Sequence, residues 1–242
     1  MLPLGLNGFN IFPAMHLSDN IIDALSVDCL IFGFIDEHLE ILLVRHAEGI
    51  SKARWALPGG WIRYNESVDA AANRLLEDLT GVSDIFLEQL YTFGDVHRYP
   101  TKRVITIAYY ALVKPEDYIL QAGFTADDVK WFKIHEVPEL PYDHRTILDK
   151  GLGHLKHKVR HEPIGFNLLP RKFTLLQLQK LYEALLETQL DKPNFRRKMM
   201  KMNLLVACDE KQKDVSHRAA NYYQFDEKVY HHLLESGFSF EI

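Results

Sequence analysis

The segment from residue 55 to residue 82 constrains the fold of this 242-residue chain more than any other. The paired glycines Gly59 and Gly60 predict a sharp turn, because glycine adopts backbone conformations that other residues avoid. A helix is expected next, with Ser67 as its N-cap, Gly81 just past its end, and apolar residues along one face at Val68, Ala71, Ala72, Leu75, Leu76 and Leu79. The segment therefore predicts a turn, a loop and a helix whose apolar face packs against another layer.

Runs rich in β-branched and aromatic residues lie on both sides of this segment. Two of them, residues 27–34 and 39–45, flank a polar turn at Asp36 and Glu37, a pattern typical of a β-hairpin. Further strands are expected at 86–91, 104–113 and 127–132, and a helix broken by two glycines at 145–158. We therefore expect one unit of mixed strands and helices over residues 1–160.

The character of the sequence changes near residue 161, where Pro163, Gly165 and Pro170 punctuate a short connection. Four elements are expected beyond it: helices at 174–188 and 193–202, and strands at 204–207 and 221–225. Helix, turn, second helix and hairpin is the order of a winged helix-turn-helix domain. We therefore place a second domain at residues 161–242, and we expect the connection at 160–171 to act as a hinge.

Charge is unevenly distributed in a chain whose net charge is −5. Residues 1–160 contain 16 basic and 22 acidic residues, whereas residues 192–218 contain eight basic and three acidic ones. A basic cluster on the second helix of such a domain indicates contact with DNA; the alternative is a solvated basic face.

Cysteine and histidine spacing predicts neither a metal site nor a disulfide framework. Cys29 and Cys208 lie far apart, and the twelve histidines show no pairing typical of metal ligands. No apolar run is long enough to span a bilayer, and residues 1–14 lack the basic region of a secretory signal. We expect a cytoplasmic protein with no cofactor and no membrane partner.

The glycine turn and the helix together resemble the Nudix box. Six residues match its framework at the right spacing: Gly60, Glu66, Arg74, Leu76, Gly81 and Val82. The resemblance implies an α+β fold in which a mixed β-sheet lies between helices. In Nudix hydrolases three carboxylates on the helix hold a divalent ion, usually Mg²⁺, that activates the attacking water.

The positions that match those three carboxylates are Leu75, Asp78 and Leu79. Two leucines remove two metal ligands, so we predict a binding domain with no catalytic residues. Glu66 and Arg74 are expected to form a structural ion pair. The alternative is an active Nudix hydrolase with relocated ligands, which cleaves a nucleotide sugar such as ADP-ribose and uses its C-terminal domain only to dimerise.

A wider resemblance joins both parts of the chain. Several segments are similar to those of the NrtR family of Nudix-related transcriptional regulators: residues 88–94, 103–112, 162–170, 173–175 and 178–179. Residues 27–34 together with the two leucines are nearest its arabinose-responsive branch. The resemblance implies a degenerate Nudix domain that senses ADP-ribose or a sugar such as L-arabinose. It also implies a winged helix that binds double-stranded operator DNA as a homodimer.

Seven residues are our candidates for effector binding: Arg45, Trp61, Glu66, Asp78, Arg103, Asp143 and His144. An indole ring can stack on a sugar, and arginines can bind phosphate or hydroxyl groups. Arg98 is a further arginine that can bind a phosphate or sugar hydroxyls. The alternatives are a core tryptophan, arginines that are only surface charges, and a structural histidine whose ring nitrogens are already paired.

Seven further residues are our candidates for DNA binding. Asn194, Arg196, Arg197, Lys198 and Lys201 belong to the expected recognition helix, and His217 and Arg218 to the wing. Phe195 and Met199, one helical turn apart, are expected to face the core. The sequence as a whole predicts a ligand-responsive transcriptional regulator.

Overall fold

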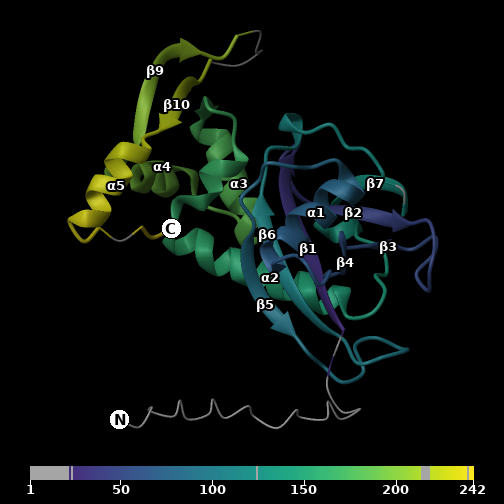
Figure 1. The fold of residues 1–242 in the computed structure, drawn as a ribbon. Coiled ribbons are helices and arrows are strands. Elements are labelled where there is room, and N and C mark those ends of the chain that lie inside the picture. The colour runs from purple at the N-terminus through teal and green to yellow at the C-terminus, as the bar shows by residue number, and fades with distance from the viewer. Residues whose placement is uncertain (1–21, 23, 124, 214–218, 239) are drawn as a thin grey trace, which may run out of the picture.

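The computed structural model describes residue 22 and residues 24–123, 125–213, 219–238 and 240–242. Two units lie side by side (Figure 1): a sheet flanked by helices, and a smaller C-terminal unit from which a two-stranded hairpin projects. None of the described helices combines the length and the apolar character that a bilayer span requires.

The larger unit contains a seven-stranded mixed sheet. Its strands are β1 (Leu25–Ile35), β2 (His38–His46), β3 (Trp55–Ala56), β4 (Gly59–Trp61), β5 (Glu88–Phe93), β6 (Ile105–Leu112) and β7 (Ala126–Lys133). They run in the order β3-β2-β1-β6-β5, while β4 pairs with β1 and β7 pairs with β2. Among the strand pairs of the described residues in this sheet, only β1–β6 is parallel. The predicted hairpin turn is confirmed, with Asp36 and Glu37 both in the left-handed region that a two-residue turn requires.

Helices cover both faces of this sheet, as predicted. Helix α1 (Val68–Thr80) begins at Ser67, whose hydroxyl accepts the Ala70 N–H, and ends at Gly81 with φ of 75°. Its apolar side joins Val27, Ile31 and Tyr109 in one buried cluster. Helix α2 (His144–His161) buries its apolar side on the opposite face of the sheet. Short 3₁₀ turns, η1 (Pro115–Asp117) and η2 (Ile134–Glu136), lie in the connections.

The predicted break in α2 is wrong, because the helix runs through both of its glycines. A Cβ atom at Gly151 would lie 2.8 Å from Cδ2 of Leu30 on β1, whereas no atom lies within 4 Å of that position at Gly153. Gly151 therefore allows α2 to pack closely against the sheet, and it does not bend the helix.

The smaller unit has the predicted winged-helix order. After η3 (Pro163–Leu168) come β8 (Phe173–Thr174), α3 (Leu175–Leu186), α4 (Lys192–Lys201), β9 (Leu205–Lys211), β10 (Asn221–Phe225) and α5 (Glu227–Glu235). The three strands form a sheet in the order β8-β10-β9. Side-chain caps start the helices at Thr174, Asp191 and Asp226. Helix α5 was not predicted, and β9 extends four residues beyond its expected end.

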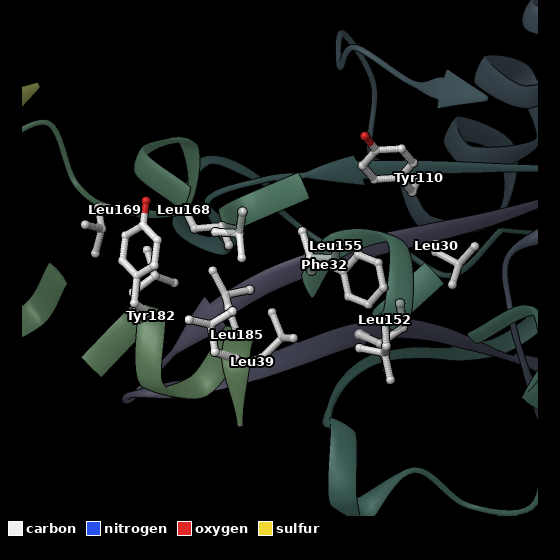
Figure 2. Close-up of a cluster of buried hydrophobic side chains, with 14 of the residues drawn as sticks. Leu30, Phe32, Leu39, Tyr110, Leu152, Leu155, Leu168, Leu169, Tyr182 and Leu185 are labelled. Carbon is white, nitrogen blue, oxygen red and sulfur yellow. The ribbon is translucent and has the colours of Figure 1, made fainter. Parts of the chain in front are cut away.

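The two units share one hydrophobic core (Figure 2). A single cluster contains Phe32 and Leu39 from the sheet, Leu155 from α2, and Tyr182 and Leu185 from α3. The expected hinge contains η3, which is largely buried through Pro163, Gly165, Phe166 and Leu168. A rotation of the winged helix would therefore rearrange packed side chains rather than bend a free linker. The boundary between residues 160 and 161 stays a prediction.

Candidate functional site

A cavity of about 190 Å³ opens at the end of the sheet where β1 begins. Its walls come from β1, β4, the loop after β2, the loop between β5 and β6, and the first residue of α2. The acidic, basic and histidine side chains in these walls are Asp28, His46, Glu48, Arg98 and His144. The cavity therefore brings together residues from five separate segments of the chain.

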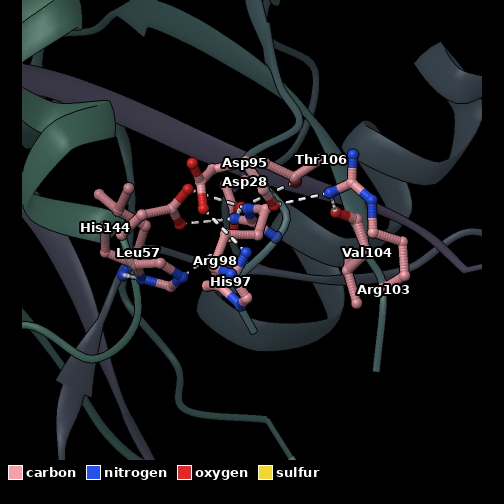
Figure 3. A network of polar contacts seen from close by, with 10 residues as sticks. Asp28, Leu57, Asp95, His97, Arg98, Arg103, Val104, Thr106 and His144 are labelled. Carbon is pink, nitrogen blue, oxygen red and sulfur yellow. Dashed lines mark hydrogen bonds and ion pairs between the residues drawn. The ribbon is translucent and has the colours of Figure 1, made fainter. Parts of the chain in front are cut away.

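A buried charge network forms the inner wall of this cavity (Figure 3). The Arg98 side chain is only 4% exposed. It donates to both carboxylate oxygens of Asp143, from Nε at 2.9 Å and from Nη2 at 2.7 Å, and to Oδ2 of Asp28 at 3.3 Å. Thr106 on β6 donates to the same Asp28 oxygen at 2.8 Å. One guanidinium is thus shared between two carboxylates, which occupy its Nε and Nη2 donors.

His144 is buried and paired at both ring nitrogens. Its Nδ1 accepts the Leu57 N–H at 3.1 Å, so Nε2 carries the proton and lies 3.4 Å from Oδ1 of Asp28. Burial lowers the pKa of His144, and it also lowers that of His46 nearby. Both rings are therefore neutral near pH 7, and His144 both lines the cavity and has the paired, structural role considered as its alternative.

Aromatic rings form the rim of the cavity. The Tyr99 ring lies 5.7 Å from Trp61 and 4.8 Å from Tyr142, measured between ring centroids. Trp61 is 43% exposed, with Lys102 Nζ 4.1 Å from its ring centre. Ser51 donates to the Tyr142 hydroxyl at 2.6 Å, and this bond lies between the cavity and a neighbouring hollow of about 760 Å³. The arrangement offers ring faces, hydroxyls and carboxylates to a small polar ligand.

The predicted effector residues are not all brought together. Trp61 and His144 line the cavity, and Asp143 lines the neighbouring hollow. Arg45 lies over Trp55 at 5.8 Å from the ring centre. Arg103 donates to the Asp95 carbonyl at 2.6 Å (Figure 3) and to the Gly94 carbonyl at 2.6 Å. The remaining two, Glu66 and Asp78, flank Arg74 away from the cavity. Whether any of the seven binds an effector stays a prediction.

Sequence reasoning missed several residues that the fold places in the cavity wall. Asp28 gives a signal, because an acidic residue inside the apolar run of residues 27–34 has to find a buried partner. Arg98 was considered as a phosphate ligand or a surface charge, and it is neither exposed nor unpaired. His46, Glu48 and Tyr142 carry no such signal, since each belongs to a loop or a strand end with ordinary polar composition.

The face of α1 that holds metal in Nudix hydrolases is apolar here. Leu75 is buried beneath Gly60, where a Cβ would lie 2.8 Å from its Cδ2, and Leu79 clusters with Val44 and Ala126. Asp78 is 57% exposed and lies 3.4 Å from Arg74. Within the described part of the chain, no three His, Cys, Asp or Glu side chains are placed to share a metal ion. The residues present do not fit a magnesium site of that kind.

The candidate DNA-binding surface lies on α4, beside the hairpin of β9 and β10 (Figure 1). Phe195 and Met199 are buried as predicted, and the Phe195 ring lies 5.9 Å from that of Tyr182 on α3. The five residues of this helix that were predicted to bind DNA are all exposed: Asn194, Arg196, Arg197, Lys198 and Lys201. Arg197 donates to the Asn194 side-chain oxygen at 2.5 Å, and His217 and Arg218 lie outside the described residues.

Comparison with known proteins places both units in families. Residues 24–151 match the NUDIX domain model, and residues 165–225 match the NrtR DNA-binding winged helix domain model. A curated relative is the ADPR responsive transcriptional repressor NtrR of Acinetobacter baylyi. It is 31% identical over 205 residues, which cover 83% of this chain and 81% of the relative.

Two solved structures from Shewanella oneidensis are also similar. NrtR complexed with a 27mer DNA is 27% identical, with a TM-score of 0.71, over 89% of this chain and 97% of that one. The NUDIX domain of NrtR complexed with ADP ribose is 30% identical, with a TM-score of 0.51, over 54% of this chain and 87% of that one. The chain therefore belongs to the NrtR family, in which a Nudix domain is followed by the NrtR DNA-binding winged helix domain.

Proposed function

We propose that this protein is a ligand-responsive transcriptional regulator, in which the Nudix domain binds a small effector and the winged helix binds operator DNA. The observation that carries the proposal is α4, which buries Phe195 and Met199 and leaves its asparagine, arginines and lysines exposed. A helix with this division fits the DNA major groove, with arginine reading base edges and lysine contacting phosphates. The relative from Acinetobacter baylyi is named a transcriptional repressor, which supports the same function.

For the effector we propose a neutral sugar of monosaccharide size, with L-arabinose as the first compound to test. A volume of about 190 Å³ lies below the roughly 300–1,000 Å³ typical of pockets for drug-sized ligands. Asp28 and Glu48 face the cavity, while Arg98 is already bonded to two carboxylates. Such a wall favours sugar hydroxyls, which donate to carboxylates, and sugar rings, which pack on aromatic faces.

ADP-ribose is the second candidate effector. The neighbouring hollow of about 760 Å³ shares Ile50, Ser51, Arg98 and Tyr142 with the cavity. The two spaces together give room for a nucleotide sugar, and ADP ribose is bound by the similar NUDIX domain from Shewanella oneidensis.

We further infer that the Nudix domain no longer hydrolyses nucleotide sugars. Leu75 and Leu79 stand where two metal-binding carboxylates are needed, and both are buried. A single exposed carboxylate at Asp78 leaves a magnesium ion without most of its protein ligands. The homodimer and the cytoplasmic location expected from the sequence stay predictions. Light scattering with and without operator DNA measures the first.

Fluorescence anisotropy with the DNA upstream of the protein's own gene tests the regulator. Binding is measured at two salt concentrations, against excess competitor DNA, with L-arabinose, with ADP-ribose and without either. We expect specific binding that weakens with salt, because displaced counterions drive phosphate contacts, and that changes with one of the two compounds. DNA binding that excess competitor DNA abolishes contradicts the proposal. Specific DNA binding that neither compound changes also contradicts it.

The alternative of a Nudix hydrolase is tested separately. AMP or phosphate release from ADP-ribose is measured with and without Mg²⁺, using an active Nudix ADP-ribose hydrolase as the positive control. We expect no release above the protein-free rate. Magnesium-dependent turnover, together with absence of specific DNA binding, establishes the hydrolase instead.

A further inference from the structure

Arg98 connects the wall of the cavity to the start of α2. It comes from the loop between β5 and β6 and lines both the cavity and the neighbouring hollow. Its guanidinium bonds Asp28 on β1 and both oxygens of Asp143, which directly precedes α2. The Asp143 carboxylate occupies the N-cap position of α2 without capping a backbone N–H, since it is turned toward Arg98 instead. This geometry links the start of the helix to the site.

A ligand in the cavity competes with Arg98 for hydrogen bonds to the Asp28 carboxylate. This carboxylate already accepts hydrogen bonds from Thr106 at 2.8 Å and from Arg98 at 3.3 Å, and the His144 Nε2 atom lies 3.4 Å away. The arginine contact is long beside the 2.7 Å bond from the same Nη2 atom to Asp143. A hydroxyl that donates to Asp28 therefore weakens the Arg98–Asp28 contact first, and it leaves Arg98 free to move with Asp143.

Helix α2 extends from this network to the winged helix. Near its end, Lys158 Nζ bonds both oxygens of Glu88, at 2.8 and 2.6 Å, which anchors the helix to β5. Lys156 Nζ lies 2.6 Å from the carboxylate of Glu187, at the end of α3. The Arg160 carbonyl accepts a hydrogen bond from the Ile242 N–H at 3.1 Å. A shift at the first turn of α2 is therefore transmitted to the DNA-binding unit through direct contacts.

We propose that Arg98 is the coupling residue of the effector site: its shared bonds to Asp28 and Asp143 transmit occupancy of the cavity to α2 and, through α2, to the winged helix. This inference rests on the proposed function, and it adds which contact carries the signal. Coupling is the factor by which the effector changes DNA affinity, and in allosteric proteins it is typically about 5- to 150-fold.

The test uses the full-length protein with Asp143→Asn, which keeps the shape of the side chain and removes its charge. Asp149→Asn is the matched control, because it makes the same chemical change on α2 at an exposed ion pair with Arg145. For each protein, calorimetry gives the affinity for L-arabinose, with ADP-ribose in parallel. Anisotropy then gives the DNA dissociation constant without the compound and at a saturating concentration of it.

We expect the ratio of those two dissociation constants to fall below about twofold in Asp143→Asn and to keep its wild-type value in Asp149→Asn. A wild-type ratio in Asp143→Asn, or an equal fall in both variants, overturns the inference. If the wild-type protein responds to neither compound, it is the proposed function that fails.

If the Asp143→Asn variant does not fold, or cannot be saturated with the compound, a second measurement on the wild-type protein replaces it. Hydrogen exchange of the wild-type protein is followed with and without L-arabinose, and with and without ADP-ribose. We expect the active compound to change amide protection in the first two turns of α2, while the amides of α1 keep theirs. Unchanged protection in α2 overturns the inference.

Discussion

Arg74 holds Glu66 with two parallel hydrogen bonds, from Nε to Oε2 at 2.8 Å and from Nη2 to Oε1 at 2.7 Å. Glu66 also accepts the Arg63 N–H at 2.7 Å, so one carboxylate fixes the loop that leads into α1. The ion pair predicted from the sequence is confirmed. A framework residue of a hydrolytic motif here serves to position the backbone between β4 and α1.

Replacing this carboxylate tests its structural role through pH. The Arg74 side chain and the Arg63 N–H hold the pKa of Glu66 at about 2, well below its ordinary value of 4.5. The stability that the ionised form contributes is therefore present above pH 4.5 and lost as the pH falls toward 2. We expect Glu66→Gln to lower the melting temperature at pH 7, and the difference from wild type to disappear at low pH. A difference that persists below pH 2 contradicts this role.

Restoring carboxylates on α1 tests whether a metal site is recoverable. Leu75→Glu and Leu79→Glu each replace a buried leucine by a charge, and we expect each to cost about 3 kcal/mol or more in the free energy of unfolding. Denaturant unfolding with and without Mg²⁺ measures this cost, with Glu77→Gln on an exposed position as the control. Full recovery of the double variant by Mg²⁺ refutes our statement that the surrounding residues do not fit the metal.

The two glycines of α2 form a matched pair. Gly153→Ala meets no atom within 4 Å, so we expect it to stabilise the protein by about 0.5–1 kcal/mol through helix propensity. Gly151→Ala gains the same propensity but pushes on Leu30, and overpacking costs about 1–3 kcal/mol. Urea unfolding is expected to show a net loss for Gly151→Ala. Equal stabilisation by both changes shows that α2 does not lie this close to β1.

Arg197→Ala tests the recognition surface of α4. A bidentate arginine contact to a base contributes about 1–3 kcal/mol of discrimination, so we expect operator affinity to fall by about 5- to 150-fold with effector affinity unchanged. Arg63→Ala, an exposed arginine of the Nudix domain, makes the same chemical change and is expected to retain wild-type affinity. An equal fall in both variants indicates a general charge effect rather than base recognition.

The fold was predictable from sequence where local signals agree. Ser67 and Gly81 bound α1 because a hydroxyl cap and a left-handed glycine act within a few residues of each other. Helix α5 has comparable signals, with Asp226 as its cap and apolar residues at Val229, Tyr230 and Leu233, so it too was predictable from the sequence.

The site was harder to predict because it depends on contacts between distant segments. Arg98 meets Asp28 across 70 positions and Asp143 across 45, and no local pattern encodes that meeting. The sequence marks Asp28 as a buried charge that needs a partner, but strand register and loop path decide which arginine reaches it. The same reason explains why Arg45 and Arg103, equally plausible by residue type, do not line the cavity.

The core shared by Leu39 and Leu185 has a consequence for how such proteins diversify. Because the sheet and α3 fill one space, a substitution on either side restricts the residues tolerated on the other. A winged helix grafted onto a foreign sensor would carry an uncovered leucine face into water, and the sensor left behind would expose the strand end that α3 covers. A working chimera therefore has to exchange both sides of this junction together.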